Sequence, residues 1–145
     1  MHLTAHTDYS LRVLMYLNQE QKPITLSELS EKLAVSRNNL IKVSNQLAKL
    51  NLIDTTRGRA GGLLIKEETG EKTLRDIIYQ TETFNLAECF SCEKCGCTFL
   101  RNCFLRKSLS DALEAFLSSL AQKTLNDVTP KPNKLNINNN MKEIL

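Results

Sequence analysis

The chain concentrates its thiol chemistry in one short segment. All five cysteines lie within fifteen consecutive residues, spaced Cys-x2-Cys-x2-Cys-x-Cys-x5-Cys: Cys89, Cys92, Cys95, Cys97 and Cys103. A disulfide scaffold would distribute its cysteines along the chain, and the first residues, MHLTAHTDYS, have none of the features of an export signal. An odd number of clustered cysteines in such a chain predicts a metal site or a redox thiol.

The spacing of these cysteines bears on which metal they would hold. Thiolates are soft ligands that select zinc, copper(I) or iron-sulfur clusters. Structural zinc sites use two cysteine knuckles separated by a longer spacer, which this segment lacks. The run Cys89 to Cys95 resembles the start of a ferredoxin-type motif, although neither the fourth cysteine nor the proline follows. The pattern favours an iron-sulfur cluster over zinc, with reactive free thiols as a third interpretation.

A second chemistry-bearing segment is strongly basic. Residues 36–66 contain six basic side chains and one acidic side chain, a net charge of +5, whereas the whole chain carries only +3. Such a concentration predicts a polyanionic partner, and the alternative is a solvated basic helix face. The residues suited to DNA within it are Ser36, Arg37, Asn38, Asn39, Lys42, Arg57 and Arg59.

These side chains suit DNA in different ways. Arginine can pair with guanine and asparagine with adenine in the major groove, while Lys42 suits a phosphate. Arg57 and Arg59 flank a glycine, so they could enter a minor groove or clamp the backbone. Ser36 has a simpler alternative role as a helix cap, and amide side chains often only face water.

Apolar periodicity places these residues on predicted elements. Helices are expected over residues 4–18, then from a capping box at Thr25 and Glu28 to about residue 35, and from the N-cap Ser36 to about Leu50. A short turn between the second and third helices predicts a helix-turn-helix. Two β-prone runs around the glycines of residues 57–62 predict a hairpin, the wing of a winged helix.

The remaining segments complete a mainly helical fold. Thr73 is expected to cap a short helix over residues 74–80, and a helix of about four turns begins near Leu105. The length of 145 residues and the low content of glycine and proline predict one mainly helical domain. Because no long apolar run is present, we expect a cytoplasmic protein without a membrane span. His2 and His6 lie near the N-terminus and are expected on the surface, and no catalytic constellation accompanies them.

Several of these stretches together resemble a known family. They are Leu3-Thr-x-x-Thr-Asp-Tyr-x-Leu-Arg-Val-Leu14, Val35-Ser-Arg-Asn38 leading to Asn45-Gln-Leu47, Arg57-Gly-x-x-Gly-Gly62, and the cysteine segment entering the last helix. The sequence resembles, over about residues 1–128, the small bacterial winged-helix regulators whose branches include NsrR and IscR. The resemblance implies a transcriptional repressor, not an enzyme.

The resemblance also implies a site. The family holds an iron-sulfur cluster, here a 4Fe-4S or 2Fe-2S cluster, with three loop cysteines that match Cys89, Cys97 and Cys103; Cys92 and Cys95 are extra. Where the IscR branch has a histidine ligand this chain has Arg106, which favours the NsrR branch with Asp8 of the other subunit as fourth ligand. For Asp8 the alternative is a favourable interaction with the helix dipole.

The implied organisation has four parts. They are a winged helix-turn-helix DNA-binding domain (1–80), a cluster loop (81–104), a dimerisation helix (105–128) and a disordered tail (129–145). The partners implied are an operator duplex, a second copy of the chain, and nitric oxide as effector. The alternatives are a regulator of the same fold that senses iron, cluster supply or redox state, and an iron-sulfur or zinc enzyme or electron carrier.

Overall fold

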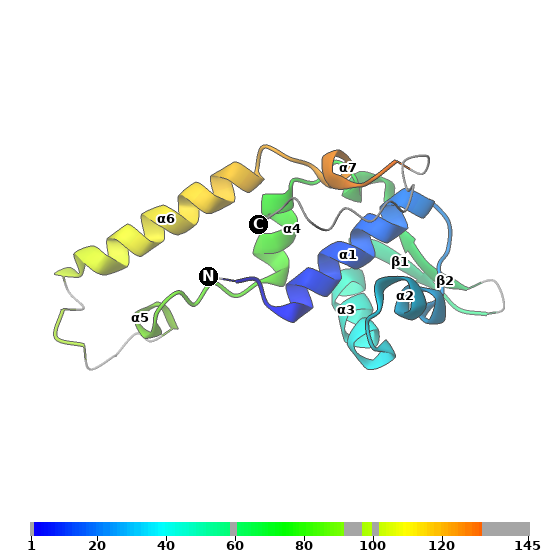
Figure 1. Ribbon diagram of the computed structural model, residues 1–145, viewed down its shortest axis with the longest axis horizontal. Coiled ribbons are helices and arrows are strands. Elements are labelled where there is room, and N and C mark those ends of the chain that lie inside the picture. The colour runs from blue at the N-terminus through cyan, green and yellow to red at the C-terminus, as the bar shows by residue number, and fades with distance from the viewer. Residues whose placement is uncertain (1, 59–60, 92–96, 100–101, 132–145) are drawn as a thin grey trace, which may run out of the picture.

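The computed structural model describes residues 2–58, 61–91, 97–99 and 102–131. Its elements follow in the order α1 (Ala5–Glu20), α2 (Leu26–Leu33), α3 (Arg37–Lys49), β1 (Ile53–Thr56), β2 (Gly62–Ile65), the 3-10 helix η1 (Glu67–Thr69), α4 (Leu74–Thr81), α5 (Glu88–Ser91), α6 (Phe104–Leu120) and α7 (Leu125–Val128). The predicted mainly helical winged fold is confirmed (Figure 1).

Hydroxyl side chains cap the N-termini of five helices in the described chain, including Thr124 at α7. Thr4, Thr25, Ser36 and Thr73 each accept a hydrogen bond from the backbone N–H three residues later. Each bond satisfies one of the donors that the first helical turn leaves without a partner. The predicted caps at Thr25, Ser36 and Thr73 are therefore confirmed.

The capping box predicted at Thr25 and Glu28 forms by one half. The Thr25 hydroxyl accepts the Glu28 N–H, but the Glu28 carboxylate accepts the hydroxyl of Tyr16 of α1 over 3.2 Å. Both halves of a box form at α7, where Thr124 and Asp127 bond each other's backbone. The backbone and side-chain hydrogen bonds from Thr124 lower the pKa of Asp127.

The first three helices share one apolar core. Between α2 and α3 the chain turns at Ala34, whose φ of 51° lies in the left-handed region, and the next residue is buried. This short turn directs α3 across α2, as the helix-turn-helix prediction requires. The core side chains from these elements are Val13, Leu14, Leu17, Leu29, Val35, Leu40, Val43 and Leu47.

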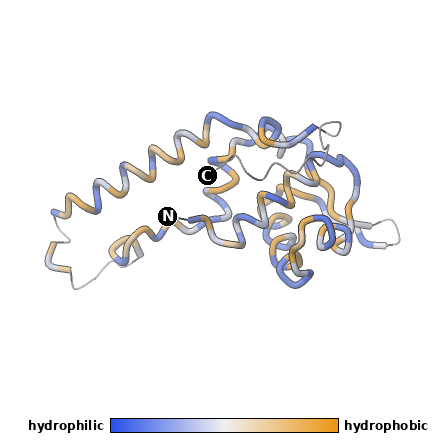
Figure 2. Tube along the Cα trace, viewed as in Figure 1, coloured by the Kyte–Doolittle hydropathy of each residue, from blue (hydrophilic) through white to orange (hydrophobic). Residues whose placement is uncertain are grey.

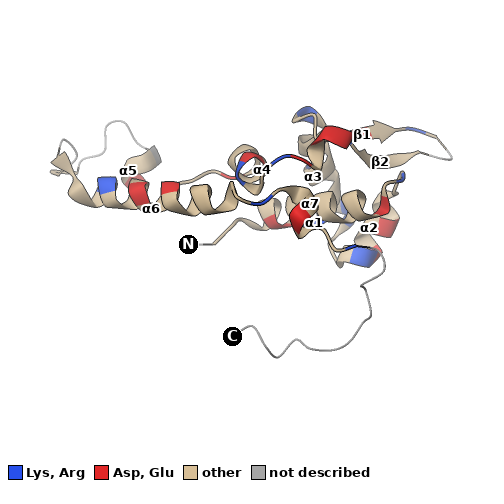
Figure 3. Ribbon diagram, turned by 90° about the horizontal axis from the view of Figure 1, so that it is seen from above, with Lys and Arg blue, Asp and Glu red and all other residues tan. Residues whose placement is uncertain are grey.

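The wing is anchored at its base to the segment before α2. β1 and β2 pair antiparallel from Ile53 opposite Ile65 to Thr56 opposite Gly62. Ile24, which is fully buried, exchanges two backbone hydrogen bonds with Leu63, of 2.9 and 2.8 Å. The wing is thus continuous with the helical core and projects beyond it beside α3 (Figures 1 and 3).

The segment expected as one helix over residues 105–128 is divided, which corrects the prediction. α6 ends at Leu120, and the chain then turns into the separate helix α7. A backbone hydrogen bond holds this turn against the start of α4, because the Leu74 N–H donates to the Lys123 carbonyl over 2.8 Å. Leu125 is fully buried in the main core, so α7 belongs to the body that contains α1.

The expectation that a disordered tail begins at residue 129 is wrong for Thr129. Thr129 Oγ1 donates to the Leu125 carbonyl over 2.7 Å and accepts from Asn18 Nδ2 over 3.0 Å. This residue is therefore held against α1. Residues 132–145, the rest of the predicted tail, lie outside the described residues.

α6 extends away from this body like an arm (Figure 1). Leu117, near its C-terminal end, is its one buried residue, whereas Phe104 and Leu105 at its start are 83% and 67% exposed. Apolar positions recur along the whole helix (Figure 2). None of the described helices is both long and apolar enough to cross a membrane.

Replacing Gly62 by alanine is expected to destabilise the fold. A Cβ at residue 62 would lie 2.7 Å from the Ile24 carbonyl oxygen, so the wing would have to move off the core. Overpacking of this kind costs about 1–3 kcal/mol. Urea unfolding of Gly62→Ala should show that loss, while Thr55→Ala on the exposed wing surface should not. Equal unfolding midpoints for Gly62→Ala and wild type would contradict the packing described here.

Candidate DNA interface and cysteine loop

The start of α3 presents polar side chains to solvent. Arg37, Asn38 and Lys42 are exposed, and Asn39 is half-buried. Arg37 Nη1 lies 3.4 Å from Ser27 Oγ of α2, so its guanidinium is near both helices of the motif. Ser36 Oγ accepts the Asn39 N–H over 3.4 Å, which is the capping role that the sequence offered as its alternative. The structure thus gathers five of the seven predicted DNA residues at one helix start.

Ile41 is a residue of this surface that the sequence analysis missed. It is 39% exposed although the neighbouring Leu40 and Val43 are buried. It lies one helical turn from both Arg37 and Asn45, which are exposed on the same side. The signal was available in the sequence, because Ile41 is an apolar residue outside the stripe formed by Leu40, Val43 and Leu47.

The first turn of α1 forms a hydrogen bond with α3. His6 Nε2 and Gln46 Oε1 form a hydrogen bond that joins the two helices. His6 is half-buried, which corrects the expectation that both histidines are surface residues. His2 is exposed, as expected.

The end of β1 carries one of the two predicted wing arginines. Arg57 is exposed, and the following Gly58 has φ of 109°, a conformation that side chains other than glycine rarely adopt. The tight turn leaves Arg57 at the projecting end of the wing. Arg59 lies outside the described residues.

The cysteine segment lies at the opposite end of the molecule from the wing (Figures 1 and 3). Cys89 is on α5 and half-buried, Cys97 is exposed, and Cys103 is half-buried as the N-cap of α6. All three are free thiols. Cys103 Sγ accepts the Arg106 N–H over 3.3 Å. Cys92 and Cys95 lie outside the described residues.

Arg106 joins the two cysteine-bearing helices. Its guanidinium carbon lies 5.6 Å from the centre of the Phe90 ring, within the range of a cation-π interaction. Phe90 directly follows Cys89 in α5, and the backbone of Arg106 bonds Cys103. Arg106 therefore brings the first and last of the three expected ligands to neighbouring elements, and the soft thiol donors fit an iron-sulfur cluster.

Asp8 is placed apart from this set in the single chain. It lies in the first turn of α1, where its carboxylate pairs with Arg12 of the next turn over 2.7 Å on the surface. No group of three or more histidine, cysteine or acidic side chains is gathered for a metal within the described residues of one chain. The ligand set predicted from the resemblance includes Asp8 of a second subunit, and one chain alone does not assemble it.

Comparison with known proteins places this architecture in a family. The Rrf2 family, described as iron-dependent transcriptional regulators, matches residues 3–131. The chain belongs to the Rrf2 family. A structure of T. potens IscR shares the fold, with a TM-score of 0.66 and 19% identity over 88% of this chain and 85% of that one.

Two curated Rrf2 relatives carry the same name. The HTH-type transcriptional regulator NsrR of Bacillus licheniformis is 38% identical over 88% of this chain and 92% of its own length. NsrR of Bacillus subtilis is also 38% identical, over 88% of this chain and 90% of its own. The chain is accordingly a transcriptional regulator of the NsrR type that binds DNA through a winged helix, and it is not an enzyme.

Two kinds of variant should separate phosphate contacts from base contacts. Arg57→Ala is expected to weaken binding to all duplex sequences alike and to lower the slope of log K against log salt by about 1, because a phosphate contact releases counterions. Asn38→Ala should instead relax sequence preference. Fluorescence anisotropy at several salt concentrations measures both, with Lys123→Ala, in the turn between α6 and α7, as the charge control. Wild-type affinity, salt slope and sequence preference in both variants would refute this interface.

Proposed function

We propose that the chain is a homodimeric transcriptional repressor whose operator affinity depends on an iron-sulfur cluster that reacts with nitric oxide. The observation that carries the proposal is the link between the two cysteine-bearing helices through Arg106. It occurs in a chain that matches regulators named NsrR over 88% of its length. Because operator DNA is cytoplasmic in bacteria, we place the regulator there.

Cys89, Cys97 and Cys103 are the protein ligands in this proposal, with Asp8 of the partner subunit as the fourth. A carboxylate is a harder and weaker ligand for cluster iron than a thiolate, so the Asp8 bond is the one most easily replaced. When bound, the cluster, of 4Fe-4S or 2Fe-2S type, supplies iron that nitric oxide binds in competition with these ligands. As a ligand, Asp8 would tie α1 to the partner's loop for as long as it remained bound.

The arm formed by α6 supports a dimer. Apolar residues recur along it at three- and four-residue intervals: Leu105, Leu109, Leu113, Phe116 and Leu120. Leu105 is exposed in the single chain and the other four are half-buried. A second copy that packs on this stripe would remove it from water. Paired arms would also fix the two α3 helices at half-sites about 34 Å apart, or a multiple of that, on the DNA.

A second candidate is a regulator of the same fold that responds to iron or cluster supply. The family description as iron-dependent favours it. Both candidates use the same thiols, and they differ in what removes the cluster. Nitric oxide added to loaded protein at constant iron separates the two, because a supply sensor loses operator affinity only when iron is withheld or chelated.

Cysteine variants test the ligand set. Anaerobically reconstituted Cys89→Ser, Cys97→Ser and Cys103→Ser should each lose the cluster's visible absorbance, since each removes a thiolate. Cys92→Ser and Cys95→Ser are matched controls that should keep it. Iron and sulfide analysis accompanies the spectra. Stoichiometric zinc without sulfide, or retained absorbance in Cys97→Ser with loss in Cys92→Ser, would overturn the proposed set.

Asp8→Ala separates the ligand role from the helix-dipole role. As a ligand variant it should keep the fold but react with nitric oxide at a changed rate, and cluster state should no longer control operator affinity. Stopped-flow absorbance and DNA anisotropy measure the two effects. If its spectrum, its reaction rate and its operator response all equal those of wild type, Asp8 is only a favourable first-turn acid.

Ile41 is proposed as a base contact on the surface of α3. The side chain of Ile41 is exposed, branched and apolar, and it lies between Arg37 and Asn45. It cannot form a hydrogen bond with a base, but it can contact the methyl group of thymine in the major groove. Removing one such methyl from an apolar contact costs about 0.8 kcal/mol, which is an affinity loss of about four-fold.

Uracil provides the test of this contact because it differs from thymine only by that methyl. A duplex selected by the loaded wild-type protein from a random pool is substituted with uracil one thymine at a time. Wild type should lose affinity at one position per half-site, and Ile41→Ser should be insensitive there. Lys42→Ala is the control, since it should bind more weakly yet still discriminate. Identical uracil sensitivity in wild type and Ile41→Ser would exclude the contact.

A further inference from the structure

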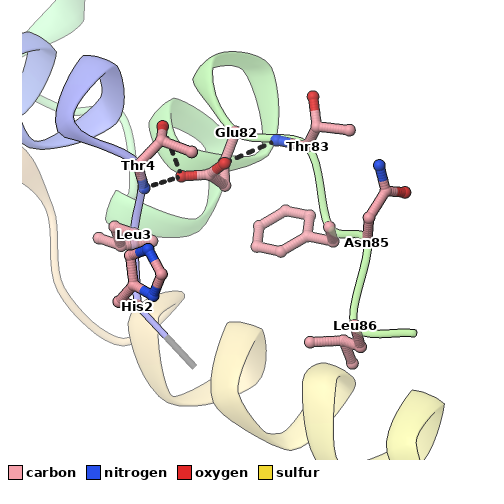
Figure 4. Close-up of a pocket in the computed structure, with 8 residues that line it drawn as sticks. His2, Leu3, Thr4, Glu82, Thr83, Asn85 and Leu86 are labelled. Carbon is pink, nitrogen blue, oxygen red and sulfur yellow. Dashed lines mark hydrogen bonds between the residues drawn. The ribbon is translucent and has the colours of Figure 1, made fainter. Parts of the chain in front are cut away.

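The first turn of α1 is fastened to the end of α4 by one carboxylate. Glu82 Oε2 accepts the Thr4 backbone N–H over 2.7 Å and the Thr4 hydroxyl over 3.0 Å, while Oε1 accepts the Thr83 N–H over 2.9 Å (Figure 4). Both oxygens of Glu82 therefore act as acceptors, one toward α1 and the other toward the chain that leaves α4. Burial alone would raise the pKa of Glu82, but the hydrogen bonds from Thr4 and Thr83 lower it.

The same turn of α1 contacts the recognition helix. Thr7, which is fully buried, donates from Oγ1 to the Thr81 carbonyl over 2.9 Å and so fixes the turn against α4. His6, one residue earlier, bonds Gln46 of α3. Residues 4–7 thus connect the end of α4 with the C-terminal part of α3.

Glu82 also stands where the chain departs toward the cysteines. It is the C-cap of α4, and Cys89 follows seven residues later. A cavity of about 200 Å³ lies beside Glu82, between residues 2–4, which precede α1, and residues 83–86 (Figure 4). Within the described chain, the hydrogen bonds that join residues 82–87 to the residues before α1 all involve the Glu82 carboxylate. A displacement of the cysteine loop would therefore act on α1 at this point.

We infer that Glu82 is a positioning residue that transmits the position of the cysteine loop to the recognition helix through the first turn of α1. The inference rests on the proposed function, in which a cluster on that loop controls operator affinity. Two sites are coupled when one element has different contacts in their two states. Here the element is the turn Thr4 to Thr7, held by Glu82 when the loop is anchored and released toward the cavity when it is not.

Glu82→Gln is the sharpest variant because it keeps the size of the side chain and changes its hydrogen bonding. A glutamine has one acceptor oxygen and one NH₂ donor group, so it can accept on the Thr4 side or on the Thr83 side but not on both. Glu114→Gln is the matched control. It removes the same charge from an exposed ion pair with Arg75, between α6 and α4.

The main measurement is the ratio of the operator dissociation constants of cluster-free and cluster-loaded protein. In Glu82→Gln this ratio should fall by roughly three- to ten-fold, within the usual range of coupling between two sites. The loaded spectrum and the affinity of the cluster-free form should stay as in wild type. Glu114→Gln should keep the wild-type ratio. His6→Ala, which breaks the connection at its α3 end, should lower the ratio as Glu82→Gln does.

Hydrogen exchange of the cluster-loaded protein gives a second measurement that requires no DNA. In this form the Glu82 carboxylate should protect the Thr4 and Thr83 amides, and in Glu82→Gln at least one of them should exchange faster by roughly ten-fold, as expected for a lost charge-assisted bond. Amides in α6 should exchange at the wild-type rate and serve as the internal reference.

Three outcomes would overturn the inference. An unchanged ratio in Glu82→Gln despite faster amide exchange would show that the contact exists but transmits nothing. Equal weakening of both forms would leave Glu82 with a structural role only. If cluster-free and cluster-loaded wild-type protein bind the operator with equal affinity, the proposed function fails and this inference fails with it. That outcome is recognised from wild type alone, without any variant.

Discussion

Burial of α1 is the interaction on which the other elements depend. Val13, Leu14 and Leu17 are almost fully removed from water, each a gain of about 1.5–3 kcal/mol before the entropy of ordering is subtracted. α1 packs on α3, α4, α7 and the wing strand β2, so the DNA-reading helix and the helix that leads to the cysteines share one support. A change in the position of α1 therefore reaches both functional ends of the molecule.

α6, unlike α1, is little buried in the single chain. Its C-terminal half is fastened to the body by Leu117, by the ion pair of Glu114 with Arg75 of α4, and by the turn that leads into α7. The rest of its apolar stripe is exposed or only half-buried in one chain, and its N-terminus carries Cys103 and Arg106. A helix that leaves apolar surface in water gains stability when that surface is covered. The proposed dimer and the proposed cluster thus draw on the same helix.

Polar contacts between distant parts of the chain fix the relative positions of the helices more narrowly than the apolar core does. The core sets which helices touch, but it is tolerant of small sliding movements because apolar contacts have little direction. Hydrogen bonds such as those from Thr4 to Glu82 and from His6 to Gln46 depend on distance and angle, so they distinguish one arrangement of helices from a slightly shifted one. In the proposed function, which requires two arrangements of the helices, such contacts are the ones that would distinguish them.

The sequence by itself determined the local features, because a helix cap or an apolar stripe is encoded within one or two turns. Ser36 and Thr73 cap as predicted, and the wing pairs around its glycines. Only the tertiary structure decided the rest. It ended α6 at Leu120, exposed Ile41, stacked Arg106 on Phe90, and joined Thr4 to Glu82 across 78 positions. Contacts at such separations follow from how whole helices pack, which no local pattern specifies.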